Sequence, residues 1–497
     1  MPPSQDHRLW IVEALTMQLA LPSAATLTQR LYQSLRDWIQ EGKLGAGTAL
    51  PSSRQLACEL GLGRNTVLGA IDRLVAEGFV ETRRGAGVFV AAWRSEALTA
   101  AASASGSAAP SLSARGRRIL DFSGVLSDRY TAFAPGVPAL DRFPRERWQR
   151  LLRRQRQRAP LEWHDYQHQG GVPALREALC DYLQLSRSVR CRPGQILITQ
   201  GAQQGFELIA RLLADAGDAV WVEEPGYGGA QSCFVAAGLD TVPLAVDEDG
   251  ANVERVPRET PPPRLIYVTP SHQYPSGVTM TLPRRMALLE AARRHGAWII
   301  EDDYDSEFRY ASAPIASLQG LVDDAPVIYV GTFSKVLYPG LRLGYLVLPE
   351  ALVDAFKRAN ARLHREGQYV AQAAVAAFIA EGHFVRHVAK MRGLYRQRQA
   401  QLRRALAPAA ARGLVLSAGQ AGMHLVAELD SFELETELVS RGQEAGILLS
   451  PLSRYFLQPP GRPGLVLGYA GATEAEIASA GRWLSDSWCQ LSIRHGR

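Results

Sequence analysis

Apolar residues near the start of the chain follow a helical period in two segments, residues 27–41 and residues 65–77. The apolar faces consist of Leu27, Leu31, Leu35, Trp38 and Ile39 in the first segment, and Val67, Leu68, Ile71, Leu74 and Val75 in the second. Gly42 and Gly78 end these segments, as glycine commonly does just beyond a helix. The pattern predicts two amphipathic helices that share one small core.

A third, shorter helix is predicted between them, with Ser52 as its cap and Gly61 as its end. After the second long segment, residues 79–83 and 88–90 read as two short strands around a glycine-rich tip. Two short helices around a glycine turn, followed by a hairpin, predict a winged helix-turn-helix, and we assign it to residues 1–92.

The rest of the chain has a different pattern. Residues 93–118 are rich in Ala and Ser, offer little to bury, and predict a flexible linker. From residue 119 to 497, short apolar runs alternate with helical segments; the clearest runs are residues 265–270, 297–304, 327–335 and 343–349. This alternation predicts an α/β domain around a buried, mostly parallel sheet.

Composition narrows the class of protein. The chain has 497 residues, 46% apolar and 21% charged, which is typical of globular domains and excludes a collagen-like or disulfide-scaffold protein. No run of 18 apolar residues and no signal peptide is visible. The five cysteines are scattered and form no CxxC pair, so we expect reduced thiols, no metal site and a cytoplasmic location.

Charge points to a polyanion at the N-terminal end. Residues 1–118 carry 13 Lys/Arg against 9 Asp/Glu, whereas the remainder carries 42 against 40. A solvated surface explains such an imbalance equally well, so the placement of the side chains matters more. Basic, amide and hydroxyl side chains stand at the starts of the two helix-turn-helix helices and on the wing, at Arg54, Arg64, Asn65, Thr66, Arg83 and Arg84. Arg can pair with guanine and Asn with adenine, and wing arginines can contact phosphates.

Lysine is scarce, which limits where lysine chemistry can occur. Only Lys43, Lys335, Lys357 and Lys390 are present beside 51 arginines. Lys335 directly follows an apolar run, and Asp302, Asp303 and Tyr304 end an earlier one. The carboxyl ends of parallel strands line the ligand crevice, so an acid and a lysine could meet there. Pyridoxal phosphate needs such a pair: an amine for a Schiff base and a carboxylate beside its ring nitrogen. Taken separately, each feature has a simpler interpretation: Lys335 as a surface lysine and the acidic segment as a solvated turn.

The first domain resembles a known family. The stretch LPSSRQLACELGLGRNTVLGAIDRLVAEGFVETRRGAGVFV is similar to the winged helix-turn-helix of GntR-family bacterial regulators. The resemblance implies that Arg54, Arg64 and Thr66 contact operator DNA and that Gly85 and Gly87 shape the wing.

The larger domain resembles fold-type I, class I aminotransferases, with a small α+β subdomain, and most closely the MocR/GabR group of regulators. The motifs are YQHQGGVPALREALCDYL, ITQGAQQGFELI, EEPGYGG, TPSHQYPSG, IIEDDYDSEF and GTFSKVLYPGLRLGYLVLP. The resemblance implies that Lys335 forms the Schiff base with pyridoxal 5'-phosphate, and it gives the other cofactor contacts. These are Asp302 at the ring nitrogen, Tyr304 at the phenolic oxygen, Tyr227 on the ring face, and Ala202, Gln203, Thr332 and Arg342 around the phosphate, with Tyr166 reaching over from a partner subunit.

The chain departs from the pattern in three places. Gln273-Tyr274-Pro275-Ser276-Gly277 replaces the usual Asn-Pro-Thr-Gly stretch, whose Asn touches the phenolic oxygen. Gly229 stands where the GABA-sensing member has an Arg that helps to grip the ligand carboxylate. Gly464 aligns with the carboxylate-binding Arg of aminotransferases, although Arg462 is near. These differences speak against GABA as the effector and favour another amine, or pyridoxal phosphate itself.

The resemblance therefore implies a homodimeric transcriptional regulator that binds an operator and senses pyridoxal phosphate or an amine at Lys335. A working aminotransferase with an accessory DNA-binding domain is the main alternative, because the cofactor-binding residues are all present in the sequence. A cofactor-free dimer that only organises DNA is a third.

Overall fold

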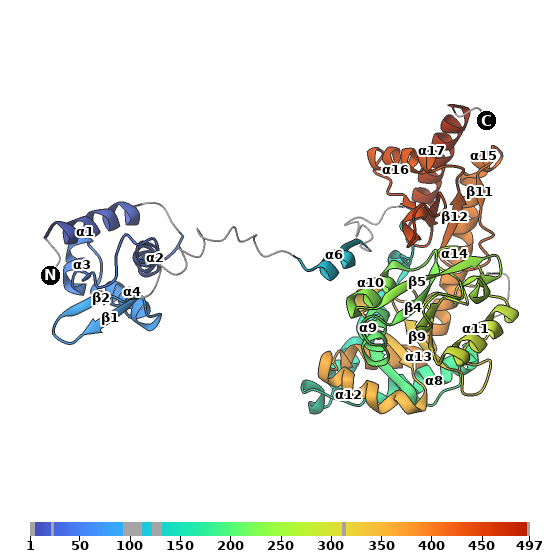
Figure 1. Cartoon of the computed structure of the whole chain (residues 1–497), viewed down its shortest axis with the longest axis horizontal. Coiled ribbons are helices and arrows are strands. Elements are labelled where there is room, and N and C mark those ends of the chain that lie inside the picture. Colours follow the sequence, from blue (N-terminus) through green and yellow to red (C-terminus); the bar gives the residue numbers. More distant parts are fainter. Residues whose placement is uncertain (1–4, 21–23, 93–111, 122–131, 311–314, 495–497) are drawn as a thin grey trace. The chain divides into compact units, whose positions relative to one another are not determined.

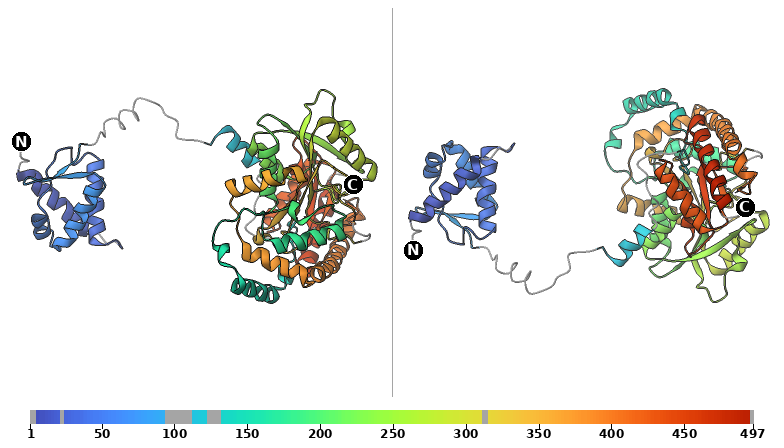
Figure 2. Two further views of the ribbon diagram at one scale, coloured as in Figure 1. Left: turned by 90° about the horizontal axis from the view of Figure 1, so that it is seen from below. Right: turned by 90° about the horizontal axis from the view of Figure 1, so that it is seen from above.

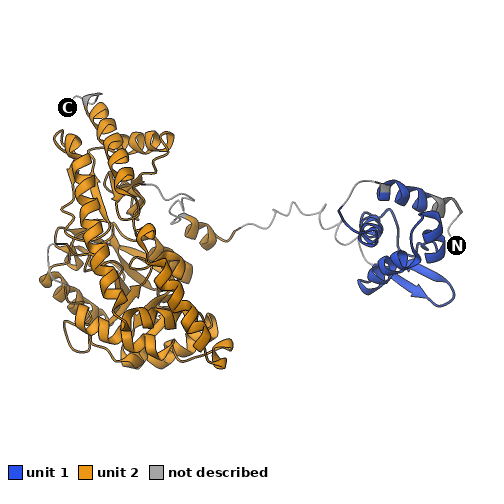
Figure 3. Ribbon diagram, turned by 180° about the vertical axis from the view of Figure 1, so that it is seen from behind, with its two compact units in different colours: residues 1–111 blue, residues 112–497 orange. Residues whose placement is uncertain are grey.

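The computed structural model describes residues 5–20, 24–92, 112–121, 132–310 and 315–494. The chain divides into two compact units, Met1–Ser111 and Leu112–Arg497, shown in separate colours in Figure 3. We call them the reader unit and the effector unit, and each is described by itself. Most of the predicted linker, residues 93–111, lies outside the described residues; its last residues already belong to a helix, α6 (Ala114–Asp121).

The reader unit contains the predicted three helices and a hairpin. Its elements are α1 (Gln5–Ala20), α2 (Leu27–Gln40), α3 (Ser53–Glu59), α4 (Arg64–Ala76), β1 (Val80–Arg83) and β2 (Gly87–Val90). The Ser52 side chain accepts a hydrogen bond from the Gln55 amide at 3.2 Å and so caps α3. Thr26 and Gln29 form a capping box that starts α2.

Helix α1 is an addition that the periodicity did not predict. Ile11, Val12 and Leu15 are buried in the same core as α2 and α4. The indole rings of Trp10 and Trp38 lie 5.3 Å apart. The core of the reader unit therefore includes residues ahead of the recognisable helix-turn-helix.

An eight-stranded sheet forms the centre of the effector unit, in the order β3-β10-β9-β8-β7-β4-β5-β6. The strands are β3 (Ile196–Thr199), β4 (Ala219–Glu224), β5 (Asp240–Asp247), β6 (Gly250–Ala251), β7 (Pro263–Val268), β8 (Trp298–Asp303), β9 (Val327–Thr332) and β10 (Gly344–Val347). The sheet is mixed, since β10 is antiparallel to both β3 and β9. Only a 3₁₀ turn, Pro339–Leu341, interrupts the connection from β9 to β10. Without a crossover helix the chain returns beside β9 in the opposite direction.

Helices pack against this sheet, as the two further views in Figure 2 make visible. The helices that contact its strands are α8 (Pro173–Arg187), α9 (Ala202–Leu213), α10 (Gly228–Ala237), α11 (Leu282–His295) and α12 (Val353–Leu363). Farther from the strands, α13 (Tyr369–Ala380) packs on α8, and α7 (Arg145–Arg158) packs on α13. The strands between them are almost entirely buried, which explains their continuous apolar runs. Among the described residues, no helix combines the length and the apolar character that crossing a membrane requires.

A smaller α+β subdomain completes the effector unit, in orange and red in Figure 1. It consists of a four-stranded sheet, in the order β11-β12-β14-β13, and four helices. The elements are α14 (His383–Ala405), α15 (Ala407–Ala410), β11 (Val415–Leu416), β12 (His424–Glu428), α16 (Phe432–Glu444), β13 (Ser450–Pro451), β14 (Gly464–Gly468) and α17 (Glu474–Arg494). Its own apolar core, which includes Leu425, Leu467 and Trp488, holds the sheet against the helices.

Candidate functional site

The strand register of the large sheet brings the predicted site residues to one edge. Asp302 on β8 pairs with Val330 on β9, and Gly344 on β10 pairs with Thr332. The acidic pair, Thr332 and the start of α9 therefore lie around the same end of the sheet, because β3 runs into α9 there. This is the edge at which ligands bind in open α/β sheets.

Asp302 and Asp303 are neighbours with different partners, because successive residues of a strand point to opposite faces. Asp302 is 5% exposed, and its Oδ2 accepts a hydrogen bond from the Tyr267 hydroxyl at 2.7 Å. Its Oδ1 is buried without a partner among the described residues. Burial, with a smaller contribution from the charge of Asp303, raises the pKa of Asp302 to about 7, although the Tyr267 hydrogen bond and Lys335 oppose the rise. An N–H donor at Oδ1, such as a pyridinium nitrogen, would satisfy this carboxylate.

Asp303 makes its hydrogen bonds with other buried side chains of the protein. Its Oδ2 accepts from Arg187 Nε at 2.7 Å and from the Tyr329 hydroxyl at 2.5 Å. The Arg187 guanidinium also donates to the Ile315 carbonyl and to Ser271. This buried, fully engaged ion pair joins α8 to the centre of the sheet and leaves Asp303 unavailable to a ligand.

Lys335 lies just beyond β9 and is half-buried. Its Nζ donates to the Gly136 carbonyl at 2.8 Å. Burial lowers the pKa of Lys335, while Asp305 and Asp302 counteract the shift. A lowered pKa increases the fraction of neutral amine, the form that attacks a carbonyl. The other three lysines stand on helices or in a turn of the described chain.

The predicted phosphate cradle lies at the start of α9. Gly201 has a φ of +86°, and no side chain caps the helix N-terminus that begins at Ala202. A Cβ on Gly201 would lie 3.7 Å from the Arg342 guanidinium, so that exposed cation stands beside the free amides. A Cβ on Gly344 would come within 3.0 Å of the Ala202 nitrogen, so only glycine lets β10 approach so closely. Free amides and one arginine suit a phosphate.

The other residues predicted to contact the cofactor differ in their hydrogen bonds and in their exposure. The Tyr227 hydroxyl accepts from Gln203 Nε2 at 3.1 Å at the start of α10. Thr332 Oγ1 donates to the Ser334 hydroxyl at 3.1 Å. Tyr166 is 67% exposed, and its ring lies beneath the Arg365 guanidinium, 4.9 Å from the ring centroid.

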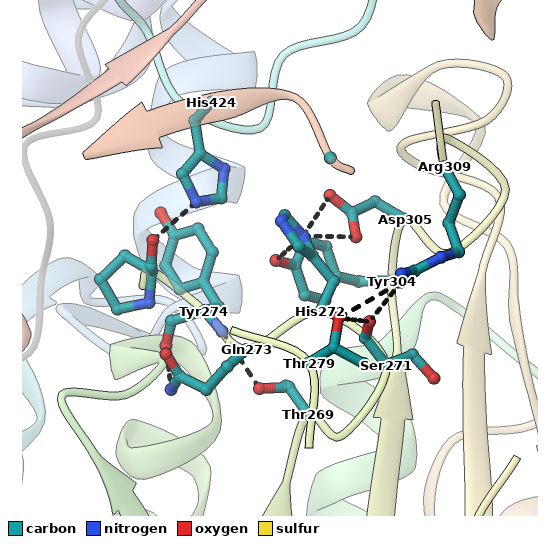
Figure 4. Close-up of polar contacts among 12 residues, drawn as sticks. Thr269, Ser271, His272, Gln273, Tyr274, Thr279, Tyr304, Asp305, Arg309 and His424 are labelled. Atoms are coloured by element: carbon teal, nitrogen blue, oxygen red, sulfur yellow. Dashed lines mark hydrogen bonds and ion pairs between the residues drawn. The ribbon is translucent and has the colours of Figure 1, made fainter. Parts of the chain in front are cut away.

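Sequence reasoning missed a polar cluster beside Tyr304, drawn in Figure 4. His272 Nδ1 lies 3.0 Å from Asp305 Oδ1 and 2.9 Å from the Tyr304 hydroxyl. When the Nδ1 proton is donated to Asp305, the Tyr304 oxygen does not need to donate to the imidazole, and its proton stays free for a ligand. His424 packs against His272 with ring centroids 5.5 Å apart. Burial, His272 and Lys335 together lower the pKa of His424 to about 3, so it is neutral. Polar residues directly after the strands, in TPSHQ and DDYDS, were the available signal.

Gln273, in the stretch that replaces Asn-Pro-Thr-Gly, has a structural role. Its amide nitrogen donates to the Pro225 carbonyl at 2.8 Å and the Tyr274 carbonyl at 2.7 Å. Its amide oxygen accepts from the Ser276 hydroxyl at 2.6 Å. Both ends of this side chain are therefore used within the protein and are not directed toward a ligand.

At both places where a carboxylate-binding arginine was considered, an added Cβ would meet close neighbours, which are side chains at Gly229 and include the backbone at Gly464. A Cβ on Gly229 would lie 2.5 Å from the Tyr227 hydroxyl, and one on Gly464 would lie 2.9 Å from the Ala427 carbonyl oxygen. Arg462 is exposed, and its guanidinium lies over the Phe456 ring, 5.9 Å from the centroid.

In the reader unit, the predicted DNA contacts lie on the surface. Arg54, Arg64, Asn65, Arg84 and Gly85 are exposed, and Thr66 is half-buried. Helix α4 starts at Arg64 without a side-chain cap, so its first amides are open to a phosphate. Arg83 differs from the others, because it forms an ion pair with Glu81 at 2.6 Å and stacks on Phe89.

A helix-turn-helix reader joined to an aminotransferase fold defines a class of regulator, and comparisons with known proteins agree. Residues 27–90 match the family of bacterial regulatory proteins of the gntR type, and residues 137–480 match aminotransferase class I and II. The chain is 43% identical to the probable rhizopine catabolism regulatory protein MocR of Rhizobium meliloti, over 89% of this chain and 90% of that one. It is 30% identical to the pyridoxine biosynthesis regulator PdxR of Corynebacterium glutamicum, over 92% and 94%.

Among solved structures, the effector unit is similar to the α-aminoadipate aminotransferase LysN of Thermus thermophilus. The TM-score is 0.67 at 27% identity, over 76% of this chain and 95% of that one. The chain belongs to the MocR-type group of GntR-family helix-turn-helix transcriptional regulators. GntR-type readers bind operator DNA, and proteins of the class I and II aminotransferase fold typically depend on pyridoxal phosphate.

Proposed function

We propose that the effector unit binds pyridoxal 5'-phosphate at the edge of the large sheet and uses it to sense an amine. The observation that carries the proposal is the buried Oδ1 of Asp302, which has no partner among the described residues. A ring nitrogen that carries a proton would supply the missing donor and be held charged by the carboxylate. The absorption spectrum of purified protein tests this, because bound cofactor colours the protein and a cofactor-free scaffold stays colourless.

The bound cofactor supplies an aldehyde that condenses with amines. The protein residues hold and polarise it. Lys335 offers an amine of lowered pKa, Asp302 would pair with the ring nitrogen, and Tyr227 would cover one face of the ring. The Tyr304 hydroxyl, positioned by His272, donates to the phenolic oxygen. The first amides of α9, at Ala202 and Gln203, hold the phosphate with Thr332 and Arg342, and Tyr166 completes the cradle of the partner subunit in a homodimer.

We propose that the effector is an amine that does not depend on a carboxylate, or the cofactor itself. Both positions considered for a carboxylate-binding arginine hold glycine, the backbone at Ala427 closely approaches Gly464, and the Arg462 guanidinium lies over the Phe456 ring. The relative in Rhizobium meliloti is named for rhizopine catabolism and the one in Corynebacterium glutamicum for pyridoxine biosynthesis. Both names suit a sensor of this kind, working in the bacterial cytoplasm where its operator lies.

Slow transamination is the alternative activity, favoured by the Tyr304 hydroxyl, which lies against His272, and by the lowered pKa of Lys335. We expect common amino acids to be turned over slowly or not at all with 2-oxoglutarate, because the carboxylate is not gripped. Turnover is measured as keto-acid release, with an authentic aminotransferase as control. Steady turnover at an enzyme-like rate would identify the effector unit as a working aminotransferase.

Replacing Arg64 tests the reader unit. Arg64 begins α4 and is exposed, so Arg64→Ala is expected to cost about 1–3 kcal/mol on the operator and to relax preference at one base position. Arg84 on the wing is the matched contrast. Its replacement by Ala should weaken binding to all sequences alike and lower the salt slope by roughly one. Binding to operator and random DNA at several salt concentrations distinguishes the two. Wild-type affinity of Arg64→Ala for the operator would contradict the placement of the recognition helix.

A further inference from the structure

Helix α7 concentrates positive charge in the effector unit, as the longer helix α14 also does. Seven of its fourteen residues are arginine and one is glutamate, a net charge of +6 that equals that of the whole chain. Residues 119–497 together carry 42 Lys/Arg against 40 Asp/Glu. Helix α7 therefore carries a local excess of positive charge, although acidic residues elsewhere nearly balance the net charge of residues 119–497.

The packing of α7 leaves this charge on the surface. Trp148 and Leu151 are buried, and the helix lies against α13 on that side. Arg154 forms an ion pair with Glu381, and Arg147 Nη1 lies 3.1 Å from His383 Nδ1. The exposed arginines that remain define the α7 arginine face: Arg145, Arg150, Arg153, Arg156 and Arg158.

No ion pair or side-chain hydrogen bond joins any residue of the α7 arginine face to the described part of the chain. Arg150, Arg153 and Arg156 are three residues apart on a helix, a spacing at which like charges are neighbours and repel. A partner with dense negative charge would relieve this repulsion.

We propose that the α7 arginine face binds the phosphate backbone of DNA beside the operator. Guanidinium groups match phosphate oxygens in charge and in their forked geometry. From Arg145 to Arg158 the helix spans about 20 Å, enough to face several phosphates of one duplex. The effector unit thus adds a sequence-independent contact to the sequence-specific one made by the reader unit.

DNA is favoured over other anionic partners by two observations. The reader unit is part of the same chain, so any operator that it binds is presented to the effector unit at a high effective concentration. The large apolar side chains of α7, Trp148 and Leu151, face the core, so the helix has no apolar anchor for a membrane. A second copy docked with the α7 arginine face on the two-fold axis would bring the same arginines together.

The test compares two triple variants of the full-length protein. Arg150→Ala/Arg153→Ala/Arg156→Ala removes three charges from the face, and a control removes three exposed arginines from other elements: Arg258→Ala/Arg362→Ala/Arg482→Ala. Both change the net charge from +6 to +3. Affinity is measured against salt on a long operator fragment with flanking DNA and on a short one limited to the reader footprint. The inference rests on operator binding by the reader unit, which the short fragment reports separately.

On the long fragment, the face variant should lower the slope of log affinity against log salt by about 0.9 for each phosphate that is no longer neutralised, up to about three. The control variant should change this slope by less than about 0.9, and neither variant should change the slope on the short fragment. The charge-keeping Arg→Lys triple should restore most of the slope. Equal slopes for the two Ala triples would overturn the proposal, as would a Lys triple as weak as the Ala triple. An unchanged DNA slope with weakened binding to phosphatidylserine vesicles would instead indicate a membrane partner and overturn it too.

Discussion

Lys335→Ala is expected to abolish the visible absorption of bound cofactor and every borohydride-reducible adduct. Arg cannot form a Schiff base, since its guanidinium stays protonated, and only three other lysines exist in the chain. Lys335 follows the carboxyl end of β9, near enough to Asp302 and Asp305 for their charges to influence its pKa. We expect Lys357→Ala, a change on α12, to leave the spectrum unchanged.

The measurement is an absorption spectrum of each purified variant, followed by borohydride reduction and mass determination of the labelled peptide. A melting curve shows whether the variant is folded. A reducible adduct that persists in folded Lys335→Ala would place the Schiff base on another lysine and overturn the assignment.

Asp302→Asn is expected to weaken cofactor binding, whereas Asp303→Asn is expected to destabilise the fold. Asp302→Asn keeps an oxygen that can accept from Tyr267 but removes the charge that faces the cofactor, so affinity for the cofactor should fall. Asp303→Asn takes the charge away from buried Arg187 and leaves a cation without its partner, at a cost of about 3–5 kcal/mol in the free energy of unfolding.

The direction of the pKa shift of Asp302 gives a further check. Its pKa is raised to about 7, so its ionised form destabilises the fold, and the penalty is fully present above pH 7. Cofactor-free Asp302→Asn should therefore be at least as stable as wild type at about pH 8, and the difference should shrink as the pH falls from about 7 toward about 4. Denaturant unfolding and cofactor titration are measured on both variants. A larger loss of cofactor affinity in folded Asp303→Asn would mean that the other aspartate faces the ring.

The local rules of the chain were sufficient for the helix-turn-helix and the wing of the reader unit. Ser52 caps α3, glycines end the helices, and the glycine tip turns the wing, because each feature depends on residues within one turn of the chain. Helix α1 was missed because its burial depends on contact with Trp38, well away in the sequence. The mostly parallel character of the sheet was predicted, but the reversed direction of β10 was not, since its apolar run is the same whichever way it pairs.

Sequence by itself determined which residue types reach the site, because Lys335 follows one buried strand, the acidic pair ends another, and parallel strands end at one edge. Tertiary structure decided what each side chain does there. Asp302 keeps an open oxygen while Asp303 is paired with Arg187, and His272 reaches Tyr304 and Asp305 across two loops. The physical reason is that hydrogen-bond and charge partners are chosen among groups brought together from distant segments, whereas helix and strand formation depends mainly on neighbours along the chain.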